Sequence, residues 1–197
     1  MNAAKPSRRV ARCMVPLVVC AALAGLAAPD AGATTTTGKP ASRWSATLCS
    51  SVTSWSKAIE KNGNDLSTQV GSDPDLATAR SEIVTSLGQA VALTDQTATK
   101  LAALGAPNVR NGAKIAKAFQ QAFASSKSKF SAAQAQAAAL PTDDPDAFNT
   151  AGSAVDQLIS AAPDPVTSAF TAINSLDSSG NLIKAFAGQK SCKPYVL

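Results

Sequence analysis

Residues 73–107 read DPDLATARSEIVTSLGQAVALTDQTATKLAALGAP and carry the signals of one long helix. Asp73 followed by Pro74 is a strong start, because Asp caps free N–H groups and Pro suits the first helical position. Apolar residues then recur with a period near seven, which places them on one face. They are Leu76, Ile83, Val84, Leu87, Val91, Leu101 and Leu104. Gly105 and Pro107 end the pattern, so we predict a helix of about 30 residues.

Two further helices are predicted on either side of this one. The first covers residues 42–61, with Asn62-Gly63 as its end and residues 64–72 as a loop. Its apolar face is formed by Trp44, Leu48, Val52, Trp55 and Ile59. The other begins between residues 107 and 112 and stops before Pro141. Its stripe is formed by Ile115, Phe119, Phe123, Phe130, Ala133, Ala137 and Leu140.

A last long helix starts at Asp144-Pro145-Asp146, which repeats the start signal at residues 73–75. Pro163-Asp164-Pro165 should break it, because proline lacks an N–H donor and clashes with the preceding turn. The apolar stripe resumes after the break and ends before Ser178-Ser179-Gly180. A short turn is then predicted over residues 182–187, ahead of a tail that contains Cys192.

The composition agrees with an all-α fold. Alanine, the best intrinsic helix former, accounts for 41 of the 197 residues. No run of alternating β-branched residues is long enough for a strand. The long helices would each span roughly 45–50 Å at 1.5 Å per residue. We therefore predict an up-down-up-down four-helix bundle with a broken fourth helix.

Residues 1–33 have the pattern of a cleavable signal peptide. A basic segment with Arg8, Arg9 and Arg12 precedes the apolar residues 14–26, and Ala31-Gly32-Ala33 supplies a cleavage pattern. The apolar segment is too short to span a membrane. Ser7-Arg8-Arg9 leaves twin-arginine export open beside the general secretory route. We predict a flexible Thr-rich tail over residues 34–41, then a single domain over residues 42–197.

Loss of the leader leaves Cys49 and Cys192, which suggests one disulfide in an exported protein. Free thiols and dimer formation are the alternatives. In the bundle, the start of the first helix and the end of the fourth lie at the same end. This topology would bring the two cysteines together.

Several kinds of chemistry are excluded or disfavoured. The chain has no histidine, which removes the usual general base and the commonest metal ligand. Asp73, Asp75, Asp143, Asp144 and Asp146 lie where helix caps are expected and do not form a calcium loop. The leader contributes most of the net charge of +5, so the charge does not indicate nucleic-acid binding. We expect no enzymatic activity, no cofactor and no metal.

Two surfaces are candidates for binding. Arg110, Lys114 and Lys117 lie close together and would suit an anionic polymer of the envelope or an anionic lipid surface; the alternative is a solvated face. An apolar groove could instead be lined by aromatic side chains, whose alternative role is the core. These are Trp44, Trp55, Phe119 and Phe123.

The chain resembles small secreted helical proteins of high-GC actinobacteria. The resemblance rests on the leader, Trp44…Leu48-Cys49…Trp55, Gly105-x-Pro107, Asn111-Gly112 and the late Cys192. It implies location and fold but no chemistry and no functional residue. We predict a monomeric, secreted, non-catalytic interaction module, extracellular or associated with the envelope. The alternative is a carrier of an apolar small ligand within the bundle.

Overall fold

The computed structural model describes residues 38–72 and 75–195. The predicted leader, and the Thr-rich stretch through Thr37, lie outside these residues. In the described part the chain forms helices and no named strand. They are α1 (Ala41–Ser72), α2 (Leu76–Leu104), α3 (Gly112–Ala138), α4 (Pro145–Ala161), α5 (Asp164–Leu176), α6 (Asn181–Ala187) and the 3₁₀ helix η1 (Lys190–Cys192).

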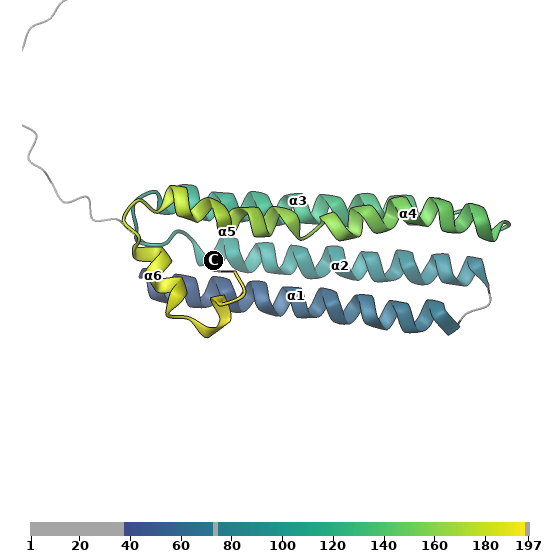
Figure 1. Ribbon diagram of the computed structural model, residues 1–197, viewed down its shortest axis with the longest axis horizontal. Helices are drawn as coiled ribbons and strands as arrows, with labels where there is room; N and C mark the ends of the chain where they lie inside the picture. Colours follow the sequence, from purple (N-terminus) through teal and green to yellow (C-terminus); the bar gives the residue numbers. More distant parts are fainter. Residues whose placement is uncertain (1–37, 73–74, 196–197) are drawn as a thin grey trace, which may run out of the picture. The chain divides into compact units, whose positions relative to one another are not determined.

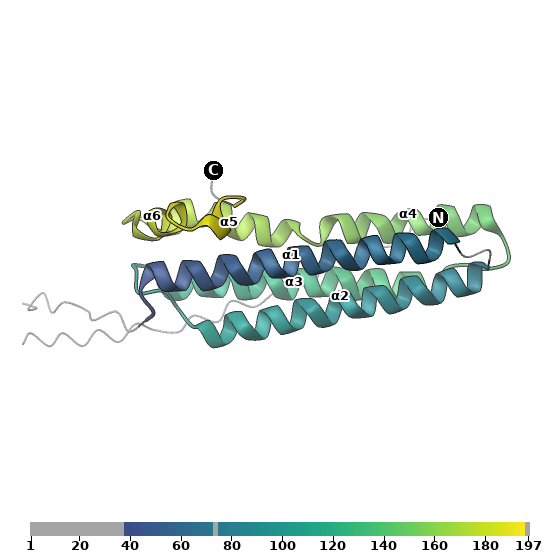
Figure 2. The ribbon, with the colours of Figure 1, turned by 90° about the horizontal axis from the view of Figure 1, so that it is seen from below.

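The long helices form the predicted all-α bundle. Helices α1, α2 and α3 run alternately up and down, and α4 followed by α5 makes the fourth rod (Figure 1). Helix α2 packs against α1 and α3, while α3 also packs against α4 and α5. Helix α1 contacts α6 and η1 (Figure 2), so the short C-terminal helices close the remaining side at one end.

Helix α1 is longer than the sequence predicted. It continues through Asn62-Gly63 to Ser72, so the predicted loop over residues 64–72 is wrong. A glycine typically ends a helix by adopting a positive φ. Gly63 does not have a positive φ, so the helix continues through it. The Asn62 amide donates to the Ser86 carbonyl oxygen at 2.9 Å, which fastens α1 to α2 at the predicted stop. At 32 residues, α1 spans about 48 Å and matches its neighbours.

Two aspartates cap helices at the end of the bundle away from the disulfide. Asp144 accepts hydrogen bonds from the N–H groups of Asp146 and Ala147, with Pro145 in the first turn, as predicted. The cap of α2 is Asp75 rather than the predicted Asp73, because the Asp75 carboxylate accepts from Ala77 and Thr78. These hydrogen bonds, with that from the Thr78 side chain foremost, lower the pKa of Asp75.

The fourth rod breaks where the prolines predicted. Helix α4 ends at Ala161, and Pro163 is the N-cap of α5, which begins at Asp164. Pro163 has no N–H with which to continue the ladder of α4. Its carbonyl oxygen instead accepts from the N–H groups of Val166 and Thr167, at 3.0 and 3.2 Å. The break therefore ends one helix and starts the next without a long loop.

The loop between α2 and α3 is held by close backbone contacts. Gly105 has a φ of 73°, which favours glycine, and ends α2. The Pro107 carbonyl oxygen would lie only 2.0 Å from a Cβ at Gly112, so this position admits no side chain. Lys39 donates its N–H to Ala106 and accepts from Asn108. Residues 38–41, the end of the stretch predicted to be a flexible tail, are thus part of the folded bundle.

The core is made of a few aromatic rings set among small side chains. The Trp44 ring lies 6.0 Å from that of Phe119, which lies 4.9 Å from that of Phe170. Each of these buried rings meets the next edge to face. Around them the helices approach through buried alanines. These include Ala79, Ala90, Ala122, Ala133, Ala137, Ala162 and Ala169.

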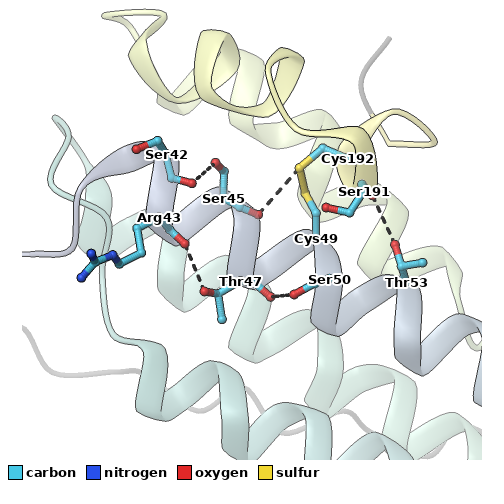
Figure 3. Close-up of a disulfide and its surroundings, with 9 residues drawn as sticks. All are labelled: Ser42, Arg43, Ser45, Thr47, Cys49, Ser50, Thr53, Ser191 and Cys192. Atoms are coloured by element: carbon cyan, nitrogen blue, oxygen red, sulfur yellow. Dashed lines mark hydrogen bonds between the residues drawn. A yellow bond between two sulfur atoms is a disulfide. The ribbon is translucent and has the colours of Figure 1, made fainter.

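The predicted disulfide joins Cys49 of α1 to Cys192 of η1, with the Cα atoms 5.1 Å apart (Figure 3). Both cysteines are completely buried. The Thr53 hydroxyl donates to the Ser191 carbonyl oxygen at 3.2 Å, which adds a second attachment to α1. We call residues 181–195 the C-terminal strap, because they cross from α5 to α1.

The disulfide should stabilise the bundle substantially. It closes a loop of 143 residues, for which the chain-entropy model gives about 5 kcal/mol. We expect the double variant Cys49→Ala/Cys192→Ala to lose about 2–5 kcal/mol of unfolding free energy in urea. Hydrogen exchange should rise mainly in the strap. The exposed neighbour Ser50→Ala is the control. An unchanged urea midpoint, or cysteines open to alkylation before reduction, would contradict this.

Candidate functional site

The three basic residues of the predicted anionic-partner face lie at one end of the bundle. Arg110 belongs to the loop before α3, and Lys114 and Lys117 lie three residues apart in the first turns of α3. All three are exposed. No ion pair or hydrogen bond joins their side chains to the rest of the described chain. Their charges are therefore available to solvent or to a partner.

Tertiary structure adds six exposed basic residues to the same end. We define the basic end as described residues 38–48, 100–120 and 170–195, which contain the start of α1, the end of α2, the start of α3 and the strap. Its basic residues are Lys39, Arg43, Lys100, Arg110, Lys114, Lys117, Lys184, Lys190 and Lys193. Sequence reasoning missed six of the nine, because they come from segments far apart in the chain.

A single acidic residue, Asp177, belongs to the basic end, and it is 3% exposed. Its carboxylate accepts from the N–H groups of Leu182 and Ile183, at 2.7 and 3.1 Å, and from the Ser179 hydroxyl. Burial raises the pKa of Asp177, but these hydrogen bonds outweigh it and leave the pKa below its ordinary value. Asp177 therefore holds α6 in place, and its negative charge offsets only one of the nine positive charges of the basic end.

The opposite half of the bundle is acidic. Three hydrogen bonds show which residues of the antiparallel helices α1 and α2 lie side by side. They are Trp44–Gly105, Trp55–Thr94 and Asn62–Ser86. Beyond Trp55, described residues 57–93 and 129–159 hold eight acids and four bases. The acids are Glu60, Asp65, Asp75, Glu82, Asp143, Asp144, Asp146 and Asp156. Positive and negative side chains are thus concentrated at opposite ends of the bundle. The net charge does not show this separation, because the two signs largely cancel in the sum.

The basic end contains the N-termini of α1 and α3 and also the C-termini of α2 and α5, so the helix dipoles there largely cancel. Neither α1 nor α3 has an acid in its first turn. Helices α2 and α4 start at the other end, where Asp75 and Asp144 cap them. The Asn111 side chain does not cap α3, because it donates to the Leu176 carbonyl oxygen at 2.9 Å.

The four aromatic residues of the predicted apolar groove are core residues instead. Trp44, Trp55, Phe119 and Phe123 each expose 5% of their surface or less. Trp44 and Phe119 meet as described above, and the Trp55 and Phe123 rings lie 5.1 Å apart. Trp55 also borders a surface depression between α1 and α2. The prediction of a groove on this set was wrong, because the rings fill the space between the helices.

An apolar groove lies elsewhere, between the second half of α1 and α4. Its volume is about 300 Å³, and it belongs to the acidic half. The sequence prediction missed it because residues 64–72 were assigned to a loop. Its walls come from α1 and α4, and one residue each from α2 and from the loop after α3 completes the lining. The lining residues are Gly63, Leu66, Ser67, Val70, Ile83, Leu140, Phe148, Asn149, Gly152, Val155, Asp156 and Ile159.

Other chemistry-bearing groups do not assemble into a reactive site in the described residues. No three Cys, Asp or Glu side chains there lie close enough to hold a metal ion. Glu60 is exposed, whereas the Glu82 Oε2 atom is buried without a hydrogen-bond partner. Lys127 pairs with Asp95 across α2 and α3. Across residues 38–72 and 75–195, no helix combines the length and apolar character that a membrane crossing requires.

Comparison with protein-family models, with curated proteins and with solved structures found no match to this chain. In the described residues, the features suited to binding are the basic end and the apolar groove.

Asp177 should make the stability of the strap depend on pH. Because its folded pKa lies below the ordinary value of 3.8, its contribution is complete above that value and disappears as pH falls through the folded pKa. We expect Asp177→Asn to lower the unfolding free energy by about 1–3 kcal/mol at pH 7. The gap from wild type should narrow below about pH 4.

Urea unfolding from pH 7 to pH 2 measures this gap. Asp143→Asn is the control, because Asp143 is exposed outside the helices. A gap that stays constant down to pH 2 would show that the loss comes from packing and not from the carboxylate.

Proposed function

We propose that this protein is a secreted, non-catalytic interaction module that binds an anionic partner of the cell envelope through its basic end. The observation that carries the proposal is the collection of nine exposed basic residues around one buried acid. Such a patch attracts polyanions at long range and holds them through many weak, exposed contacts.

The arrangement of the bundle supports binding end-on. The strap, the loop before α3, the start of α1 and the end of α2 all contribute cations to this one end. The acidic half would be repelled by the same partner. A polarised bundle therefore has one favourable orientation on an anionic surface.

The proposed location rests on the buried disulfide and the leader pattern. A structural disulfide is typical of proteins that leave the reducing cytosol. The pattern in residues 1–33 is that of an exported precursor. The resemblance to small secreted actinobacterial proteins points to the same compartment.

The test removes charge from the basic end. In the variant Arg110→Ala/Lys114→Ala/Lys117→Ala, we expect retention on phosphatidylglycerol vesicles or on polyphosphate to fall about tenfold or more at low salt. The effect should shrink as salt rises, because exposed charges are screened over about 8–10 Å near physiological ionic strength. Alanine is an equal or better helix former at Lys114 and Lys117 of α3, and Arg110 is an exposed loop residue, so the melting temperature should hardly change. The two probes distinguish a lipid surface from a soluble polymer.

The matched control is Lys57→Ala/Lys61→Ala/Lys129→Ala, which removes the same charge from the acidic half. It should bind nearly as well as wild type. Equal losses in the two variants would mean that net charge alone governs binding. If the first variant is retained as well as wild type, Arg110, Lys114 and Lys117 form an ordinary solvated face that binds no anionic partner. Either result would overturn the proposal.

A further inference from the structure

The groove between α1 and α4 is separate from the basic end and plays no part in the function proposed above. The fourth side of the bundle is closed near the disulfide by the strap, which packs on α1. Further along, α1 and α4 form opposite walls of the groove. The strap therefore covers one stretch of this side and leaves the other open.

Two glycines keep the groove wide. Gly63 of α1 and Gly152 of α4 both line it, and a Cβ on either would meet nothing within 4 Å. Neither has positive φ, so backbone conformation does not require glycine. Glycine inside a helix costs about 0.5–1 kcal/mol relative to alanine. The chain thus carries two destabilising residues at places where the fold does not need them and where side chains would narrow the groove.

The lining of the groove suits a hydrocarbon group. Phe148, Val155 and Leu140 line the groove as buried side chains, and half-buried aliphatic side chains complete the lining. The half-buried set is Leu66, Val70, Ile83 and Ile159. A volume of about 300 Å³ is at the lower end of the range for small-molecule pockets. The space therefore fits a short apolar tail better than a large rigid ring system.

The rim of the groove is polar and negatively charged. Exposed Asp156 and Asn149 lie about two turns apart on the α4 wall, and exposed Glu60, which does not itself line the groove, precedes Gly63 by about one turn of α1. Neither carboxylate forms an ion pair with another described residue. Together with the surrounding acidic half, they favour a positively charged group at the mouth.

From these observations we propose that the groove binds a small amphipathic cation, with its apolar tail between Gly63 and Gly152 and its cationic head beside Asp156. The tail would remove the aliphatic lining from water, and the head would remain at the exposed rim. This places ligand binding in the acidic half, away from the surface proposed to meet the envelope.

The first experiment fills the groove. Decyltrimethylammonium, below its micellar concentration, is titrated into the purified protein by calorimetry. We expect Gly152→Leu and Gly63→Leu each to weaken binding at least tenfold without lowering the melting temperature, since leucine is a better helix former than glycine. Gly71→Leu is the matched control, because Gly71 is also in α1 with open space around it but does not line the groove. It should bind like wild type.

The second experiment tests the charge at the rim. Decyl sulfate should bind at least tenfold more weakly than the cation, and Asp156→Asn should narrow that preference several-fold. Binding that survives both leucine substitutions, or a preference for the sulfate, would overturn the proposal. Sedimentation velocity is run in parallel. A wild-type dimer that Gly152→Leu converts to a monomer would overturn it too, by showing that a second copy covers the groove. The basic-end variant should bind the cation normally, so this test can fail independently of the proposed function.

Discussion

The covalent attachment of the strap to α1 is the constraint on which the other features depend. Cys49 and Cys192 are joined deep in the structure, and the aromatic rings of the strap continue the core beyond the four rods. Phe186 packs against both Trp44 and Phe170, and the Tyr195 ring stacks on Phe170 at 4.6 Å. The strap thereby links α1 to α5 at the disulfide end of the bundle.

This one-sided attachment explains why the two ends of the bundle differ. Near the disulfide the space beside α1 is filled, and the strap adds Lys184, Lys190 and Lys193 to the surface. Beyond it α1 and α4 face each other across the groove, with glycine on both walls. The same folding pattern therefore produces a closed, cationic end and an open, acidic half, and it separates the two proposed binding surfaces along one axis.

Small residues make such a thin core sufficient. Alanines at the interfaces let the backbones approach, so a few aromatic rings fill the remaining space. Buried polar groups are few in the described residues, and most of their hydroxyls donate within their own helix. Thr94 accepts from the Trp55 indole and donates to the Ala90 carbonyl oxygen, while Ser126 donates to that of Ala122. The i−4 hydrogen bonds satisfy the hydroxyl donors of Thr94 and Ser126, and the Trp55–Thr94 bond also links α1 to α2.

The sequence by itself determined most of the helices and the break at Pro163, because periodicity, caps and proline act over a few neighbouring residues. The disulfide also needed the bundle topology to bring Cys49 and Cys192 together. The sequence misplaced the end of α1, since Asn62-Gly63 resembles a stop until packing on α2 extends the helix through it. It also predicted only three of the nine cations of the basic end, and it left Trp55 and Phe123 open between an apolar groove and the core, to which their burial assigns them. Only the tertiary structure decided these points. A surface is formed by segments that are far apart in the sequence, and their sequence separation does not indicate how close they lie in the folded protein.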